Sequence, residues 1–264
     1  STKGAYVDAS YNGTVTANDA GVQNTDNNFG TGGGLTASKA PTATSIADGR
    51  IGVAADFDGT NDFICIDTNV GDCNNDENST YDDQIEQRTI SFWFNPETLP
   101  SGAAKDRAFM LYEEGGAGNG LNVYINGTKF VGGAWAESND YKWNGSWVTS
   151  SKSLEAGSWY FAAMVFDNPA SGDQTLKIYL DGELEGTIDA ETIAPTHGGD
   201  DGLGAVIKAS KVMYPGWDTP PCNVVPHSGS CNDGDIKHGN DEQSNFFEGK
   251  MDEFRVTDTA RDSD

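Results

Sequence analysis

The chain has 264 residues, of which 41 are Asp or Glu and 16 are Lys or Arg, so its formal net charge at pH 7 is −25. A field of that sign repels phosphate backbones and anionic lipid, and no apolar run approaches the roughly 20 residues that span a bilayer, so we expect neither nucleic acid binding nor membrane insertion. Cations are the expected partners, and Ca²⁺ is the usual ion for clustered carboxylates.

Short β-rich runs bounded by turn residues recur along the chain, and helical periodicity is nearly absent. In chain order the predicted strands are residues 52–57, 63–66, 88–95, 109–113, 121–125, 129–135, 147–150, 159–166, 175–180, 183–188, 205–209 and 250–257. Turns are predicted at Asn126-Gly127 and Asp181-Gly182. About a dozen strands suffice for two packed sheets, which favours a single all-β domain over residues 1–264. Buried tryptophans contribute large apolar areas, and we expect Trp93 and Trp159 in the core.

Two long segments, residues 67–87 and 210–245, resist strand assignment and are predicted to be surface loops. The four cysteines fall into two close pairs, Cys65 with Cys73 and Cys222 with Cys231. Three pairings exist, and the local one requires the least ordering of the chain, so we predict loops pinned by their own disulfides. Disulfides imply an oxidising compartment, hence an extracellular or cell-surface location, whereas four reduced thiols are the alternative. The chain opens at Ser1, which we interpret as a processed or excised domain.

Five segments, in order, resemble motifs of the laminin-G-like family of concanavalin A-like jelly rolls. They are residues 56–63 (DFDGTNDF), 89–96 (TISFWFNP), 155–162 (EAGSWYFA), 178–183 (IYLDGE) and 247–256 (FEGKMDEFRV). The resemblance implies a two-sheet antiparallel jelly-roll sandwich. It says less about function, because this fold hosts lectins, adhesins, pentraxins and glycosidases.

A structural Ca²⁺ at the sheet rim is a further implication of the resemblance. In that family an Asp of the last strand and backbone carbonyls from the N-terminal segment and an early Asp-Gly turn hold the ion. Asp252 matches the strand Asp, Gly59 matches the turn glycine, and a carbonyl from about Tyr6 to Asp8 would complete the set. The alternative is that Asp252 only accepts hydrogen bonds from loop amides.

An acidic loop is a second candidate for calcium. Asp72, Asn74 and Asp76 alternate as in a D-x-N-x-D calcium loop, but Glu77 stands where an EF-hand needs Gly, so this is not an EF-hand. A looser calcium loop and a plain solvated acidic loop both remain open.

A cluster of aromatic residues predicts a glycan surface, because sugar sites combine an aromatic platform with amide and carboxylate groups. The candidates are Trp135, Tyr141, Trp143 and Asn144, together with Tyr214 and Trp217 in the proline-rich segment. The competing interpretation is that half of these tryptophans belong to the core or anchor loops.

The leading hypothesis is therefore a calcium-binding, lectin-like module that binds carbohydrate or a cell-surface glycan. The E-x-D-x-x-E string of jelly-roll glucanases is absent, and so is a nucleophile elbow, so we expect no enzyme. A structural subunit or spacer of an extracellular filament or adhesin, contacting flanking domains or filament neighbours, is the first alternative. A polysaccharide-cleaving enzyme with non-standard residues is the second.

Overall fold

The structure is a computed structural model in which β-strands are the only regular elements of the described residues. It describes residues 5–6, 23–24, 27–30, 49–51, 54–59, 64–66, 86–101, 108–115, 119–137, 142–169, 174–189, 202–203, 213–215, 227–232, 236–238, 246–257 and 259–261. Within these ranges no helix is long and apolar enough to cross a membrane.

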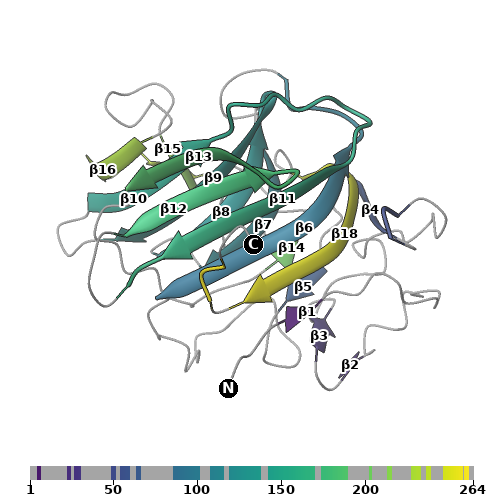
Figure 1. The fold of residues 1–264 in the computed structure, drawn as a ribbon, viewed down its shortest axis with the longest axis horizontal. Coiled ribbons are helices and arrows are strands. Elements are labelled where there is room, and N and C mark those ends of the chain that lie inside the picture. Colours follow the sequence, from purple (N-terminus) through teal and green to yellow (C-terminus); the bar gives the residue numbers. More distant parts are fainter. Residues whose placement is uncertain are drawn as a thin grey trace.

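A seven-stranded antiparallel sheet, here the front sheet, faces the viewer in Figure 1. Its main path runs β1–β18–β6–β11–β12–β13, and β4 also pairs with β18. Its strands are β1 (Ala5–Tyr6), β4 (Ala55–Asp58), β6 (Gln87–Pro96), β11 (Tyr160–Asp167), β12 (Thr175–Leu180), β13 (Glu183–Asp189) and β18 (Glu248–Thr257).

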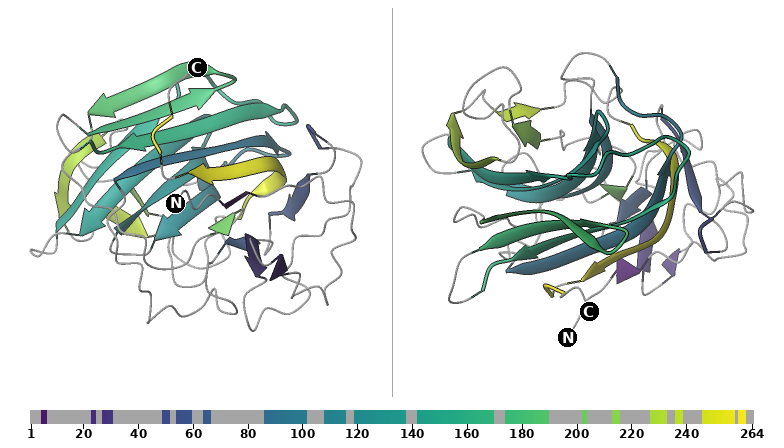
Figure 2. Two further views of the ribbon diagram at one scale, coloured as in Figure 1. Left: turned by 60° about the horizontal axis from the view of Figure 1, so that its bottom comes forward. Right: turned by 45° about the horizontal axis from the view of Figure 1, so that its top comes forward.

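A nine-stranded antiparallel sheet, the back sheet, runs in the order β16–β10–β9–β8–β7–β14–β5–β3–β2. Its strands are β2 (Gln23–Asn24), β3 (Asn27–Gly30), β5 (Ile64–Ile66), β7 (Ala108–Gly115), β8 (Asn119–Asn126), β9 (Lys129–Glu137), β10 (Lys142–Thr149), β14 (Gly202–Leu203) and β16 (His227–Asn232). A separate pair joins β15 (Met213–Pro215) to β17 (Ile236–His238). Figure 2 shows the two large sheets stacked as curved layers, which confirms the predicted all-β sandwich.

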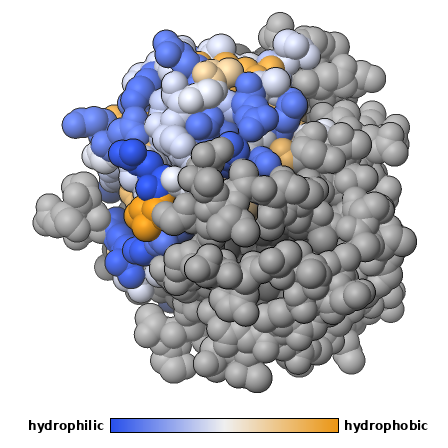
Figure 3. Space-filling model, turned by 90° about the vertical axis from the view of Figure 1, so that its right-hand side faces the viewer, coloured by the Kyte–Doolittle hydropathy of each residue, from blue (hydrophilic) through white to orange (hydrophobic). Residues whose placement is uncertain are grey.

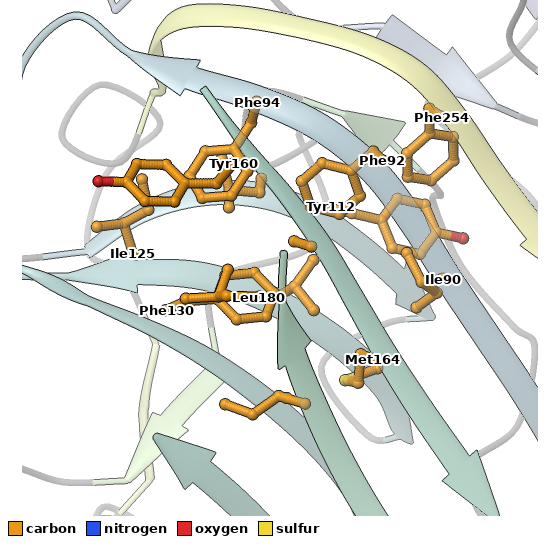
Figure 4. Packing of buried hydrophobic residues seen from close by; sticks show 14 of the residues in the cluster. Ile90, Phe92, Phe94, Tyr112, Ile125, Phe130, Tyr160, Met164, Leu180 and Phe254 are labelled. Carbon is orange, nitrogen blue, oxygen red and sulfur yellow. The ribbon is translucent and has the colours of Figure 1, made fainter. Parts of the chain in front are cut away.

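The core lies between the two sheets and is rich in aromatic rings (Figure 4). Phe92 and Phe94 of β6 meet Phe130 of β9, with ring centroids 6.5 and 6.0 Å apart. Tyr112 of β7 lies 5.0 Å from Phe254 of β18 by the same measure. All five side chains are at most 2% exposed, so both sheets depend on one shared apolar layer.

Two glycines allow the sheets to approach closely. A Cβ on Gly132 of β9 would lie 2.8 Å from both Ile178 Cγ2 and Met164 Sδ of the front sheet. A Cβ on Gly186 of β13 would lie 2.6 Å from Val148 Cγ2 of the back sheet. Because real Cβ atoms do not approach this closely, any larger residue here would push the layers apart.

The long segment 210–245 differs from the prediction. It contributes three strands instead of forming only a loop, and one of them, β16, extends the back sheet beyond β10 along residues 227–232. Strand β10 also begins at Lys142, earlier than predicted. Backbone pairing on both sides of β10 explains this, because a central strand tolerates polar and glycine residues that disfavour strand formation in isolation. The strand predicted at 205–209 lies outside the described residues.

Trp93 is not a core residue, which corrects the prediction for that side chain. It alternates with the buried Phe92 and Phe94, so it lies on the outer face of the front sheet, where it is half-buried. Trp159 is also half-buried, just before β11. The period-2 alternation of strand side chains was sufficient to place Trp93 opposite its neighbours.

Candidate functional site

Asp252 lies at a break along one edge of β18. Strand β4 pairs with β18 as far as Met251, and β1 pairs with it again at Arg255 and Val256. Between these pairings β18 shifts its register against β6, and Glu253 adopts a positive φ of 51°. A bulge of this kind turns backbone groups away from the ladder and is common beside functional positions.

The two carboxylate oxygens of Asp252 have different environments. Oδ2 accepts a hydrogen bond of 2.7 Å from the backbone N–H of Ile51, whereas Oδ1 is buried with no hydrogen-bond partner among the described residues. The residue is 1% exposed, and this burial raises the pKa of its carboxyl group, an effect opposed by the backbone amides of Ile51, Glu253 and Arg50. A buried ionised oxygen without a partner is costly, so Oδ1 is a suitable ligand for a cation.

Gly59 cannot share one ion with Asp252, contrary to the expectation from the resemblance. In the β4–β18 register Ala55 lies opposite Met251 and Asp58 opposite Glu248, so Gly59 lies about five positions along the strand from Asp252. At about 3.3 Å per residue this separates them by roughly 16 Å. Gly59 has a packing role instead, because a Cβ there would lie 2.8 Å from Glu248 Cβ and its φ is +71°.

Other cation ligands near Asp252 have to come from the backbone or from undescribed residues. Within the described ranges no group of three or more His, Cys, Asp or Glu side chains is placed to hold a metal. Strand β1 is antiparallel to β18, and its last residue, Tyr6, pairs with Arg255, three residues from Asp252. The other residues expected to offer a carbonyl, 7 and 8, lie outside the described residues. The acidic loop with Asp72, Asn74 and Asp76 lies outside the described residues.

Trp135 occupies a distinctive register position on the outer face of the back sheet. Its neighbour Ala134 belongs to the core, so residue 135 belongs to the opposite face. Its Cα partners are Gly120 on β8 and Gly145 on β10, and the row continues to Gly115 on β7 and Gly229 on β16. We call these four glycines and Trp135 the glycine row. No opposing side chain therefore stands beside residue 135 on either neighbouring strand.

The other predicted aromatic residues are placed differently. Trp143 is two residues from Gly145, so it is a diagonal neighbour of Trp135 on the same face. Asn144 lies opposite Ala136, on the other face of the sheet, and so does not join this pair. Tyr214 is in β15, while Tyr141 and Trp217 lie outside the described residues.

The part of the outer face next to the glycine row is closed. Met110, Asn122, Tyr124, Val131 and Trp147 point away from the core, yet all are fully buried. A Cβ on Gly133 would lie 2.3 Å from Trp147 Nε1 and 2.7 Å from Asn122 Oδ1, so Trp147 lies across that glycine. Trp147 is therefore a structural residue and does not contribute to a ligand surface on this face.

The strand order also limits the cysteine pairing. Cys65 is in β5 and Cys231 is in β16, six inter-strand spacings apart in the back sheet. At about 4.8 Å per spacing they are far beyond the 7 Å Cα separation that a disulfide can bridge. One of the three pairings is thereby excluded, while the local pairing, which involves Cys73 and Cys222 outside the described residues, remains a prediction.

Residues 58–214 match the family model of the concanavalin A-like lectin/glucanases superfamily. The chain belongs to this superfamily. No curated protein sequence matches it. The superfamily match includes β8, β9 and β10, and therefore most of the glycine row, but it ends before β18 and Asp252.

Solved structures resemble the chain in fold. The binding domain of Paraclostridial Mosquitocidal Protein 1 is 12% identical with a TM-score of 0.51, and the match covers 85% of this chain and 44% of that one. The binding domain of botulinum neurotoxin serotype G is 10% identical with a TM-score of 0.49, covering 82% and 42%. A heptameric SAP-like pentraxin of Limulus polyphemus is 11% identical with a TM-score of 0.36, covering 70% of each chain. The chain thus spans less than half the length of both toxin domains.

Proposed function

We propose that the chain is a non-enzymatic carbohydrate-binding module and that its sugar lies beside Trp135 on the outer face of the back sheet. The observation that carries this proposal is the glycine row. Side chains directly opposite in a sheet normally fill the space beside each other, with Cβ atoms about 5 Å apart. Trp135 has a glycine as its Cα partner on both neighbouring strands, so no opposing side chain competes for its row, and the contact that we propose is a sugar ring stacked on the indole.

Charge favours an uncharged sugar at this surface. Glu137 is the Cα partner of Trp143, and Glu113 lies two register positions from the glycine row, on the same face of the sheet. With a net charge of −25 over the chain, carboxylates or sulfates on a ligand would be repelled here. A neutral pyranose offers a C–H face to the aromatic residues and needs no counter-charge.

We also propose that Ca²⁺ binds at Asp252. Oδ1 would be a direct ligand, and backbone carbonyls of the chain after Tyr6 would supply the others. The ion would compensate the buried charge and tie β18 to the N-terminal segment. Its role is structural, because the glycine row lies on the other sheet. An extracellular or cell-surface location, where Ca²⁺ is plentiful and disulfides persist, is part of the same proposal.

Replacing Trp135 with Ala is expected to weaken binding of a neutral oligosaccharide about 30-fold, since truncating a central aromatic anchor costs about 2 kcal/mol. A glycan array identifies the oligosaccharide, and calorimetric titration measures the affinity of both proteins. Tyr179→Ala, an aromatic truncation on the front sheet, is the matched control and should bind normally. Equal affinity of Trp135→Ala and the parent, with the fold intact by circular dichroism, would refute the proposed site.

A further inference from the structure

The outer face of the front sheet carries a second surface, built from well-packed strands that face the viewer in Figure 1. One register row crosses five strands from Arg255 through Ser91, Ala163 and Tyr179 to Leu184. The two smallest side chains, Ser91 and Ala163, are at its centre. Leu184 is 53% exposed and Tyr179 is half-exposed, so this row is open to solvent.

Aromatic side chains border the small centre on the neighbouring row. Trp93 and Phe161 are Cα partners, both half-exposed, with ring centroids 5.3 Å apart. The guanidinium carbon of Arg50 lies 4.8 Å from the centroid of the Trp93 ring, a cation–π geometry. Among the described residues, the exposed large hydrophobic side chains are Ile51 and Leu184. In Figure 3, which shows another side of the molecule, the coloured residues are mainly hydrophilic.

Three cations lie on this surface, although the chain as a whole is strongly acidic. The nearest described carboxylates on the same face already have partners, since Asp181 pairs with Lys152 and Asp167 accepts a hydrogen bond from Gln87 Nε2. Lys177 lies two residues before Tyr179 on β12, on the same face of the sheet. No carboxylate pairs with it among the described residues. Arg50 is exposed, and the side chain of Arg255 is 54% exposed. Glu253 Oε2 accepts from Arg255 Nη2 at 2.8 Å, but its own side chain is only 9% exposed, so the cation is the partner that faces solvent.

The geometry points to a binding surface for an anionic polysaccharide, a chain of sugars that carry carboxylate or sulfate groups. We call the surface formed by Arg50, Trp93, Lys177, Tyr179 and Arg255 the basic aromatic patch. Its aromatic rings suit the faces of pyranose rings, and its cations suit the anionic substituents. It is independent of the Trp135 surface, which lies on the other sheet and is flanked by Glu113 and Glu137.

A slender ligand fits the charge distribution better than a second copy of the chain. Surface charges are screened beyond about 8 Å at physiological ionic strength, so a single polysaccharide strand interacts mainly with the patch it touches. A second copy docking here through a two-fold axis would bring the same cations, Arg50, Lys177 and Arg255, against those of this chain, and like charges in contact repel.

The test measures binding of the intact chain to alginate, dextran sulfate and unmodified dextran by biolayer interferometry. We expect the chain to bind at least one of the two anionic polymers through this patch, and we expect no binding of unmodified dextran there. The affinity for the anionic polymer should fall as the salt concentration rises from 50 to 500 mM. The double variant Arg50→Gln/Lys177→Gln should lose at least about tenfold in affinity, and Tyr179→Ala about fivefold. Alginate and dextran sulfate distinguish carboxylate from sulfate recognition.

Lys129→Gln is the matched control for Lys177→Gln alone, because it removes one lysine charge at the start of β9 in the back sheet. An equal loss in this control, or no effect of Tyr179→Ala, would reduce the interaction to unspecific charge attraction and overturn the proposal. Absence of binding to both anionic polymers would also overturn it, as would self-association that the patch variants abolish. Trp135→Ala should leave anionic binding unchanged, so failure here and failure of the proposed function are distinguishable.

Discussion

Replacing Asp252 with Asn is expected to abolish stabilisation of the chain by Ca²⁺. At a Ca²⁺ concentration about 100 times its Kd, linkage adds about 2.7 kcal/mol, which raises the Tm of a domain of this size by about 5–10 °C. The amide of Asn retains an acceptor for the Ile51 N–H but lacks the charge that a calcium ion needs. Differential scanning calorimetry of the EDTA-treated protein, with and without added Ca²⁺, measures the effect.

Without calcium, the stabilities of the parent and of Asp252→Asn should differ in the opposite direction. Burial raises the pKa of the Asp252 carboxyl, so its stability contribution is fully present below the ordinary pKa of Asp and is lost as pH rises through the raised value. At pH 7 in EDTA the neutral Asn variant should therefore be at least as stable as the parent. Asp56→Asn, a carboxylate removal on the adjacent β4, should keep the calcium response. A calcium response that persists in Asp252→Asn would contradict the proposed site.

Replacing Gly249 with Ala is expected to destabilise the fold by about 3 kcal/mol or more. Gly249 has a φ of +150°, and a Cβ there would lie 2.3 Å from the carbonyl oxygen of Asn95 and 3.0 Å from the backbone N of Glu97. Backbone atoms held in the β6–β18 pairing cannot move aside as a side chain can, so strain and steric overlap act together. Urea unfolding should show a lower midpoint with an unchanged m-value.

Gly157→Ala separates the two causes. Gly157 also has a positive φ, +77°, but nothing lies within 4 Å of a Cβ at that position. Its substitution therefore reports only the conformational cost, about 1–2 kcal/mol. If Gly249→Ala lowers the free energy of unfolding by no more than Gly157→Ala does, the result would contradict a close approach of β6 and β18 at Gly249.

Local sequence patterns were sufficient for the elements whose signal is local. The alternation of Ile90, Phe92 and Phe94 predicted a strand with one buried face, and the structure has all three in the core. Asn126-Gly127 predicted a tight turn, and β8 and β9 meet there with Gly127 at a φ of +58°. In both cases the physical cause, side-chain alternation or a positive φ, acts within a few residues.

Features set by pairing between distant segments could not be predicted in this way. The matched motifs suggested that Gly59 and Asp252 share an ion, and only the β4–β18 register separates them. The glycine row brings together residues from β7, β8, β9, β10 and β16, whose glycines have no common sequence signal. Likewise, nothing in the sequence around Trp147 shows that its side chain is fully buried, which only the folded structure reveals.

The six tryptophans allow the proposed sugar site to be located directly. Each indole N–H gives one signal in a two-dimensional ¹H–¹⁵N NMR spectrum, and single substitutions assign the signals. Titration with the neutral oligosaccharide should shift the Trp135 and Trp143 signals saturably, with the signals of Trp93 and the buried Trp147 unchanged. Stationary Trp135 and Trp143 signals, with saturable shifts at Trp93 instead, would contradict a sugar site on the back sheet.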